Sequence, residues 1–152
     1  MKNKNPFEKS LMPELGRTAK HAGYYFIDIL QEHGIDLSKE QWLVLKKLHE
    51  NDGQIQNNLA FLTNRCKTSL TRLINTLEKK GYVNRVSSKK DKRINHVYLT
   101  DTGINIFNRS LPILHILVTN LQEGIDPKDM DKTIKVLQKI QENINKHHNN
   151  IN

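Results

Sequence analysis

The segment from residue 54 to residue 99 constrains the fold most, because its hydrophobic pattern changes once from helical to strand-like. Between residues 67 and 80 apolar side chains recur at spacings of three and four, which places them on one face of a helix; they are Leu70, Leu73, Ile74 and Leu77. Gly81 follows, and glycine readily takes the left-handed conformation that ends a helix. The sequence therefore predicts an amphipathic helix over 67–80 with one buried face.

After this helix the pattern repeats every second residue. Residues 82–86 and 95–99 read as short strands, and the polar, cationic residues 87–93 between them read as an exposed loop. A shorter helix precedes the turn at 63–65, and its predicted core residues are Ile55, Leu59, Ala60 and Leu62. Helix, turn, helix and hairpin in this order predict a winged helix-turn-helix.

The positive charge of the chain is concentrated in the same segment. The 152 residues carry a formal net charge of +8. Residues 54–99 contain ten Lys or Arg and two acids, a net charge of +8, so the rest of the chain, with fourteen residues of each sign, is neutral. A charged run is often only a solvated surface, but this one coincides with a helix suited to a DNA groove. We interpret the segment as a nucleic-acid-binding lobe.

The exposed face of the 67–80 helix holds short hydroxyl side chains and cations. Such side chains can reach base edges and phosphate oxygens when a helix end enters a major groove. The candidate groove contacts are Lys67, Thr68, Ser69, Thr71 and Arg72. The candidate contacts from the wing are Lys89, Lys90, Asp91, Lys92 and Arg93. We expect the cations to position the protein on the phosphates while the groove contacts read the sequence.

Two helices are predicted before this segment. A long helix lies within 10–34, and Ser38 with Gln41 forms a capping box for the next one. The second helix carries Trp42 inside a periodic apolar pattern. Trp42 is therefore predicted to belong to the core rather than to serve as a platform for a ligand.

Two more helices are predicted after the hairpin. Thr100 can cap the first of them, which contains Pro112 and is therefore expected to be kinked or locally broken there. Asp126, as the N-cap, and Pro127, at the first helical position, start the last helix. Both helices have apolar residues at helical spacing.

The length of the chain predicts a single domain, residues 1–152. Within it, residues 38–100 form the winged lobe, and residues 10–34 and 101–147 are helical without a charge excess. A winged helix does not need these helices, so we expect the two chain ends together to form a dimer interface. The alternative is that they complete the core of a monomer. The predicted fold is mainly α with a small β-hairpin wing, a winged helix-turn-helix flanked by N- and C-terminal dimerisation helices.

Several short motifs resemble those of the MarR family of bacterial transcriptional regulators. They are Leu59-Ala60, Thr63, Lys67, Ser69, Thr71-Arg72, Leu77-Glu78-Lys79-Lys80-Gly81, Asp91-x-Arg93 and Leu99-Thr100-Asp101-x-Gly103. The resemblance is close over about residues 59–103 and architectural outside them. It implies a homodimer that places two recognition helices in successive major grooves of a pseudo-palindromic operator. It also implies that the wing sends Arg93 into the adjacent minor groove, supported by Asp91.

The resemblance further implies a sequence-specific, double-stranded DNA-binding transcription regulator, a repressor that a small molecule can release. Related regulators often bind small, frequently anionic aromatic or phenolic ligands between the long helices and the DNA-binding lobe. The candidate residues for such an effector pocket are His21, Tyr24, Tyr25, Trp42 and His115. Each of them can instead be an ordinary packing or surface residue.

Cys66 departs from the family pattern, in which an Asp often precedes the Lys of this helix. A thiol at a helix N-terminus, between Arg65 and Lys67, lies in an electropositive environment that favours oxidation. The hypothesis is that oxidation of Cys66 blocks DNA binding, and it fails if Cys66→Ser leaves the peroxide sensitivity of binding unchanged. The alternative is a small residue tolerated at a weak cap.

Other classes of protein have less support in the sequence. It contains no glycine-rich phosphate loop, HExxH or CxxC motif, so we predict no enzyme, no cofactor and no metal site. A single cysteine excludes an intrachain disulfide. No apolar run approaches the roughly 20 residues that span a bilayer and no signal peptide is evident, so a cytoplasmic protein is expected. The alternatives are a winged-helix protein-interaction module and a non-specific DNA-binding protein without ligand sensing.

Overall fold

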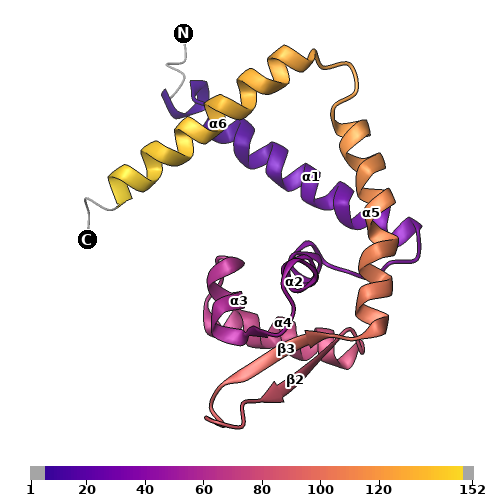
Figure 1. Ribbon diagram of the computed structural model, residues 1–152. Helices are drawn as coiled ribbons and strands as arrows, with labels where there is room; N and C mark the ends of the chain where they lie inside the picture. Colours follow the sequence, from indigo (N-terminus) through magenta and orange to yellow (C-terminus); the bar gives the residue numbers. More distant parts are fainter. Residues whose placement is uncertain (1–5, 149–152) are drawn as a thin grey trace. The chain divides into compact units, whose positions relative to one another are not determined.

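The computed structural model describes residues 6–148, which form a series of helices and one small sheet (Figure 1). The elements in chain order are η1 (Pro6–Lys9), α1 (Met12–Glu32), α2 (Lys39–Glu50), β1 (Gln54–Ile55), α3 (Gln56–Leu62), α4 (Lys67–Lys79), β2 (Val83–Ser87), β3 (Asn95–Leu99), α5 (Asp101–Leu121) and α6 (Pro127–His148). The chain divides into two compact units between Val118 and Thr119. The fold class predicted from the sequence, mainly α with a winged helix-turn-helix, is confirmed.

The three strands form one antiparallel sheet in the order β1-β3-β2. Val97 in the central strand lies opposite Arg85 of β2 and Gln54 of β1. The hairpin was predicted, but β1 was not, because two residues are too few to show an alternating pattern. The additional strand joins the start of α3 to the base of the wing.

The core of the first unit is built from all its major elements. The predicted stripe of α4 is confirmed, since Leu70, Ile74 and Leu77 are fully buried and Leu73 packs against the core. Each such side chain contributes about 1.5–3 kcal/mol of burial free energy. The other fully buried apolar residues are Leu30, Ile35, Val44, Leu45, Leu48, Leu59, Val83 and Val97.

Two of the core residues predicted for α3 are exposed. Ile55 and Leu62 lie at the surface, whereas Leu59 and Ala60 are buried. The helix has only seven residues, so a single turn of it faces the core.

Trp42 joins three helices and is confirmed as a residue packed against the core. Its indole Nε1–H donates to the buried Ser110 Oγ of α5 at 2.8 Å. Its ring stacks on Phe107 of α5 and meets Phe26 of α1 edge-on, with centroid distances of 5.7 and 5.9 Å. These contacts fix α1 and the first part of α5 on α2.

The start of α5 is locked onto the end of α4. Thr100 Oγ1 accepts from the Gly103 N–H at 3.0 Å, as predicted for a cap, and donates to the Gly81 carbonyl at 2.6 Å. A Cβ on Gly103 would lie 2.0 Å from the carbonyl oxygen of Tyr82. Only glycine allows this approach, which brings the start of α5 against the backbone between α4 and β2.

Pro112 does not break α5. The helix runs unbroken from Asp101 to Leu121, so the predicted local break is wrong. Ser110 and Ile113 on either side of it are buried, and their packing holds both halves of the helix in place although one backbone hydrogen bond is lost.

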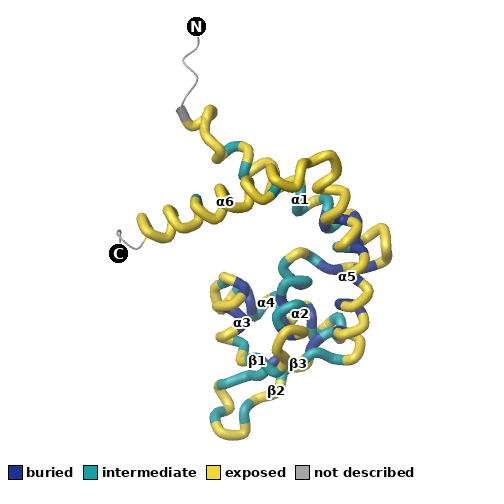
Figure 2. Tube along the Cα trace, turned by 45° about the horizontal axis from the view of Figure 1, so that its top comes forward, coloured by how far each residue is buried: buried dark blue, intermediate teal, exposed yellow. Residues whose placement is uncertain are grey.

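Helix α6 starts as predicted, because Asp126 Oδ1 accepts from the Lys128 N–H at 2.7 Å. None of its described residues is buried, and in Figure 2 its trace is yellow, for exposed, with short teal parts of intermediate burial. Yet it carries apolar residues at helical spacing, and Ile134 and Ile144 are 44% and 56% exposed. Within this chain α6 therefore has an uncovered apolar face.

Candidate nucleic-acid interface

The turn before α4 is fixed by its own backbone. Asn64 has a positive φ of 52°, and its N–H donates to the Phe61 carbonyl at 3.0 Å. The Arg65 N–H donates to the Ala60 carbonyl at 2.8 Å. This pair of hydrogen bonds is the Schellman motif that closes a helix, here α3, around a left-handed residue. The chain therefore enters α4 in a defined direction.

The far end of α4 is held by a second Schellman motif and by ion pairs. The Gly81 and Tyr82 N–H groups donate to the Glu78 and Leu77 carbonyls, both at 2.9 Å, and Gly81 has a φ of 72° as predicted. The Lys80 Nζ lies 2.7 Å from Asp36 Oδ2 in the loop before α2. Both ends of the helix are thus attached to the rest of the lobe.

Glu78 ties α4 to the first strand of the wing. Its Oε2 accepts from Arg85 Nη2 at 2.6 Å and Nε at 3.2 Å, and its Oε1 accepts from the Arg85 N–H at 3.2 Å. The Arg85 side chain, helped by its backbone N–H and its charge, lowers the pKa of Glu78 despite some burial. The carboxylate is charged at neutral pH and orients β2 on α4.

The predicted groove contacts fall into two groups. Lys67, Thr68 and Arg72 are exposed, and within residues 6–148 their side chains make no hydrogen bond or ion pair. Ser69 Oγ accepts from Arg65 Nη1 at 3.2 Å. Thr71 Oγ1 donates to the Lys67 carbonyl at 2.9 Å and accepts from Gln56 Nε2 at 2.8 Å. Three side chains are therefore free to meet a ligand, and two are partly committed.

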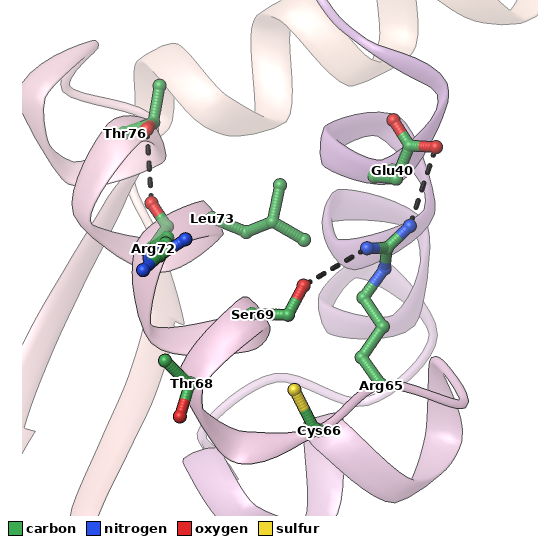
Figure 3. A pocket seen from close by; sticks show the side chains of 8 residues that line it. All are labelled: Glu40, Arg65, Cys66, Thr68, Ser69, Arg72, Leu73 and Thr76. Carbon is green, nitrogen blue, oxygen red and sulfur yellow. Dashed lines mark hydrogen bonds and ion pairs between the residues drawn. The ribbon is translucent and has the colours of Figure 1, made fainter.

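A shallow groove of about 420 Å³ runs along this face of α4 (Figure 3). Its walls come from α4, the turn before it and the first turn of α2. The lining residues are Glu40, Arg65, Cys66, Thr68, Ser69, Arg72, Leu73 and Thr76. The groove brings predicted DNA-contact residues together with Arg65, which was predicted only as a charged neighbour of Cys66, and with Glu40, for which no role at this surface was predicted.

The wing loop is closed at its base and organised at its tip. The Ser88 N–H donates to the Ile94 carbonyl at 2.8 Å. Asp91 Oδ1 accepts from the N–H and Nε of Arg93 at 2.9 and 3.2 Å, and its Oδ2 accepts from Nη2 at 3.3 Å. These hydrogen bonds, the side-chain ones first, lower the pKa of Asp91. The Arg93 side chain is oriented by Asp91 yet 91% exposed.

The ten cations of residues 54–99 divide by their partners. Four lie beside carboxylates, in the pairs Arg65–Glu40, Lys80–Asp36, Arg85–Glu78 and Arg93–Asp91. The other six are exposed and form no ion pair within the described chain; they are Lys67, Arg72, Lys79, Lys89, Lys90 and Lys92. The unpaired charge therefore lies on α4 and on the wing.

Cys66 is the N-cap of α4 and is exposed. Its side chain makes no capping hydrogen bond, whereas Ser38 caps α2 and Thr100 caps α5. The oxidation hypothesis for Cys66 stays a prediction.

The five candidates for an effector pocket occupy different environments. Trp42 and Tyr25 are partly buried against the core, whereas His21, Tyr24 and His115 are exposed. None of the five lines the groove on α4 or a smaller cavity, of about 80 Å³, at the base of the wing. Their role in ligand binding stays a prediction.

Residues 6–148 offer neither a cluster of metal ligands nor a membrane-spanning helix. No group of three or more His, Cys, Asp or Glu in this part of the chain could hold a metal ion. None of the described helices is long and apolar enough to cross a membrane.

Sequence patterns missed the residues that support α4. Gln56 donates a hydrogen bond to Thr71, 15 residues further along the chain. Glu40 forms an ion pair with Arg65, 25 residues further along. The sequence placed Asn64 and Arg65 in a turn, but no local pattern connects Arg65 with Glu40.

Residues 37–94 match the model of the MarR family. Over 73 residues the chain is 30% identical to an uncharacterized HTH-type transcriptional regulator, YybA, of Bacillus subtilis (strain 168). The aligned segment is 48% of this chain and 49% of the relative. It is 25% identical over 112 residues to the transcriptional repressor MprA of Escherichia coli (strain K12). The aligned segment is 74% of this chain and 64% of the relative. The chain thus spans about half to two thirds of the length of these relatives.

The fold is similar to that of the transcriptional repressor CouR bound to a 23-mer DNA duplex. The TM-score is 0.81 at 21% identity, over 93% of this chain and 99% of the other. A structure of CouR from Rhodococcus jostii RHA1 bound to p-coumaroyl-CoA has a TM-score of 0.72 at 19% identity, over 88% and 92% of the two chains. Similarity at this level of identity establishes the shared fold.

Proposed function

We propose that this chain, a member of the MarR family through residues 37–94, is a sequence-specific double-stranded DNA-binding transcription regulator and acts as a dimeric repressor. The observation that carries this proposal is the location of the unpaired cations. They occupy the exposed face of α4 and the wing, two elements that a winged helix-turn-helix presents to a major and a minor groove. The repressor MprA and the DNA-bound CouR support the same function by similarity.

Contacts from the two elements would have different roles. Lys67 and the wing lysines suit phosphate oxygens, and phosphate contacts position the protein without reading sequence. Arg72 and Thr68 are free to reach base edges, and an arginine bidentate to guanine is worth about 1–3 kcal/mol of discrimination. Arg93, exposed and oriented by Asp91, suits the narrow minor groove, whose negative potential attracts arginine.

A dimer follows from the uncovered apolar surface. Helix α6 has no buried residue in the described chain, although its apolar residues are periodic. α5 likewise exposes Leu111, Ile116 and Val118. A second copy of the chain would cover such faces and would present two recognition helices to one duplex.

A small aromatic or anionic effector is part of the proposal. Its support is the similarity to CouR, which has been crystallised with p-coumaroyl-CoA. A ligand that binds one spacing of the two recognition helices better than the other would shift the population and release DNA. Trp42 is the single tryptophan, so a change in its fluorescence on titration with aromatic acids measures this binding directly.

We also propose that the chain is not an enzyme and that it acts in the cytoplasm. Its family consists of transcriptional regulators, and a protein that binds chromosomal DNA acts where the chromosome is.

The test is a fluorescence-anisotropy titration of labelled duplex over a salt series. The logarithm of the affinity should fall steeply with the logarithm of salt concentration, by about 0.9 per phosphate contact. Arg93→Ala should weaken binding tenfold or more while the dimer stays intact, because a minor-groove contact is lost. Lys139→Ala on α6, which also removes one exposed positive charge, should leave the affinity nearly unchanged. Absence of binding at low salt would refute the proposal, and an unchanged affinity of Arg93→Ala would refute the role of the wing.

A further inference from the structure

Arg65 is a paired cation of the DNA-binding lobe whose guanidinium contacts the side chains of two helices. Its Nη2 lies 3.4 Å from Glu40 Oε1 in the first turn of α2, and its Nη1 donates to Ser69 Oγ in the first turn of α4 at 3.2 Å. Figure 3 shows the guanidinium between these two side chains, across the groove. One planar group therefore bridges two helices whose relative position decides what α4 can reach.

The backbone of Arg65 is fixed as well as its side chain. Its N–H closes the Schellman motif on Ala60, after the left-handed Asn64. The side chain is 30% exposed and that of Glu40 is 40% exposed, so the pair lies at the edge of the groove. Arg65 is thus attached at three points, to α3, α2 and α4.

Glu40 is well prepared to hold this guanidinium. Partial burial raises the pKa of Glu40, but hydrogen bonds from its own backbone N–H and from Ser38, with the charges of Arg65 and Lys39, outweigh burial and lower the pKa. The carboxylate is therefore charged at neutral pH. It offsets the charge of Arg65, whereas Arg72 in the same groove has no such partner within residues 6–148.

The contact with Ser69 has a consequence for base recognition. Because Ser69 Oγ accepts from Arg65, its own hydroxyl proton is directed away from the guanidinium. An oriented hydroxyl donor suits an acceptor such as guanine O6 or N7, thymine O4 or a phosphate oxygen. Thr71 differs, since its proton goes to the Lys67 carbonyl.

We propose that Arg65 is the positioning residue of the recognition helix: held by Glu40, it sets the first turn of α4 against α2 and orients the Ser69 hydroxyl as a donor toward DNA. This inference rests on the proposed function, because it describes how the same surface acquires its sequence preference. Arg65 contributes to specificity through Ser69 and not as a phosphate contact.

The test uses Arg65→Lys, which keeps the charge but cannot make both contacts in the planar geometry of arginine. Glu40→Gln keeps the shape of the acid and removes its charge. The matched control is Arg17→Lys on α1, where the arginine also pairs with a glutamate, Glu14. Each protein is titrated with the duplex that the parent enriches from a random-sequence pool, taken as the operator, and with a scrambled duplex of equal length, over a salt series.

Arg65→Lys and Glu40→Gln should each lower the ratio of operator to scrambled affinity about tenfold, the range of one oriented contact. In Arg65→Lys, which keeps the charge, the affinity for the scrambled duplex and the salt slope should stay as in the parent. Glu40→Gln removes a negative charge and should not weaken binding to the scrambled duplex. The double variant should lose no more of the ratio than either single variant. Equal losses on both duplexes would show that Arg65 and Glu40 support binding without setting the sequence preference, and would overturn the inference. Unchanged ratios would also overturn it.

A second measurement needs no DNA. The Leu70 N–H donates to the Cys66 carbonyl at 3.0 Å and reports opening of the first turn of α4. Its hydrogen exchange in the free dimer should be severalfold faster in Arg65→Lys than in the parent or in Arg17→Lys. Unchanged exchange would contradict the positioning role even if the parent bound no DNA, and a parent without duplex preference would contradict the proposed function alone.

Discussion

At the scale of single residues, close backbone approaches decide how the winged lobe is joined to the long helices. Gly103 at the start of α5 lies against the Tyr82 carbonyl, and Thr100 caps the helix at the same place. The Tyr82 oxygen also accepts from the Thr100 N–H at 3.1 Å. Because the obstructing atom belongs to the backbone, a side chain at position 103 cannot be accommodated by a change of rotamer.

Gly103→Ala should therefore destabilise the protein by about 1–3 kcal/mol, the usual cost of overpacking. The matched control is Gly23→Ala in α1, where an added Cβ meets no atom within 4 Å. The control should be stabilising by about 0.5–1 kcal/mol, because alanine is the better helix former. Urea denaturation measures both changes, and equal stability of the two variants would show that the approach to Tyr82 is not restrictive.

The sequence predicted those residues whose role depends on near neighbours. The caps at Ser38, Thr100 and Asp126 and the glycine after α4 were read from local motifs. The Arg65–Glu40 and Gln56–Thr71 contacts were not predictable, because they join residues distant in the chain. Local rules describe a helix end, and only the folded arrangement reveals which helix lies opposite.

At the scale of elements, α4 and the hairpin behave as one unit. Leu70, Ile74 and Leu77 bury one face of α4, and Glu78 connects its last turn to Arg85 of β2. The periodicity of the sequence predicted the helix and both strands of the hairpin. It did not predict β1, which becomes a strand only because β3 lies beside it.

The tie between Glu78 and Arg85 predicts a pH dependence of stability. Because the pKa of Glu78 is lowered in the folded state, its stabilising contribution is present above its ordinary pKa of 4.5 and is lost as the pH falls through the lower folded value. Glu78→Gln should cost about 1 kcal/mol at pH 7, a value reduced for partial solvent exposure. The difference in unfolding free energy between the two proteins should shrink as the pH is lowered below 4.5, and a difference independent of pH would exclude the charged contact as its cause.

At the scale of the whole molecule, the exposed apolar residues of α5 and α6 favour association with a second chain. We expect Ile134→Glu on α6 to weaken dimerisation at least tenfold, because a buried glutamate at an apolar interface is costly. Asn143→Glu adds the same charge nine residues later, two and a half helical turns away on the opposite side, and should leave the dimer intact. Sedimentation equilibrium measures both, and two equally stable dimers would place the interface elsewhere.

In the proposed dimer, two copies of α4 and the wing read a DNA sequence together. This arrangement can be tested by selection of bound duplexes from a random-sequence pool with the 152-residue chain, followed by sequencing. We predict enrichment of an inverted repeat whose half-site centres are separated by about 10 base pairs, one turn of the duplex. A pool that stays random after repeated rounds, or an enriched single half-site without its inverted copy, would contradict the account.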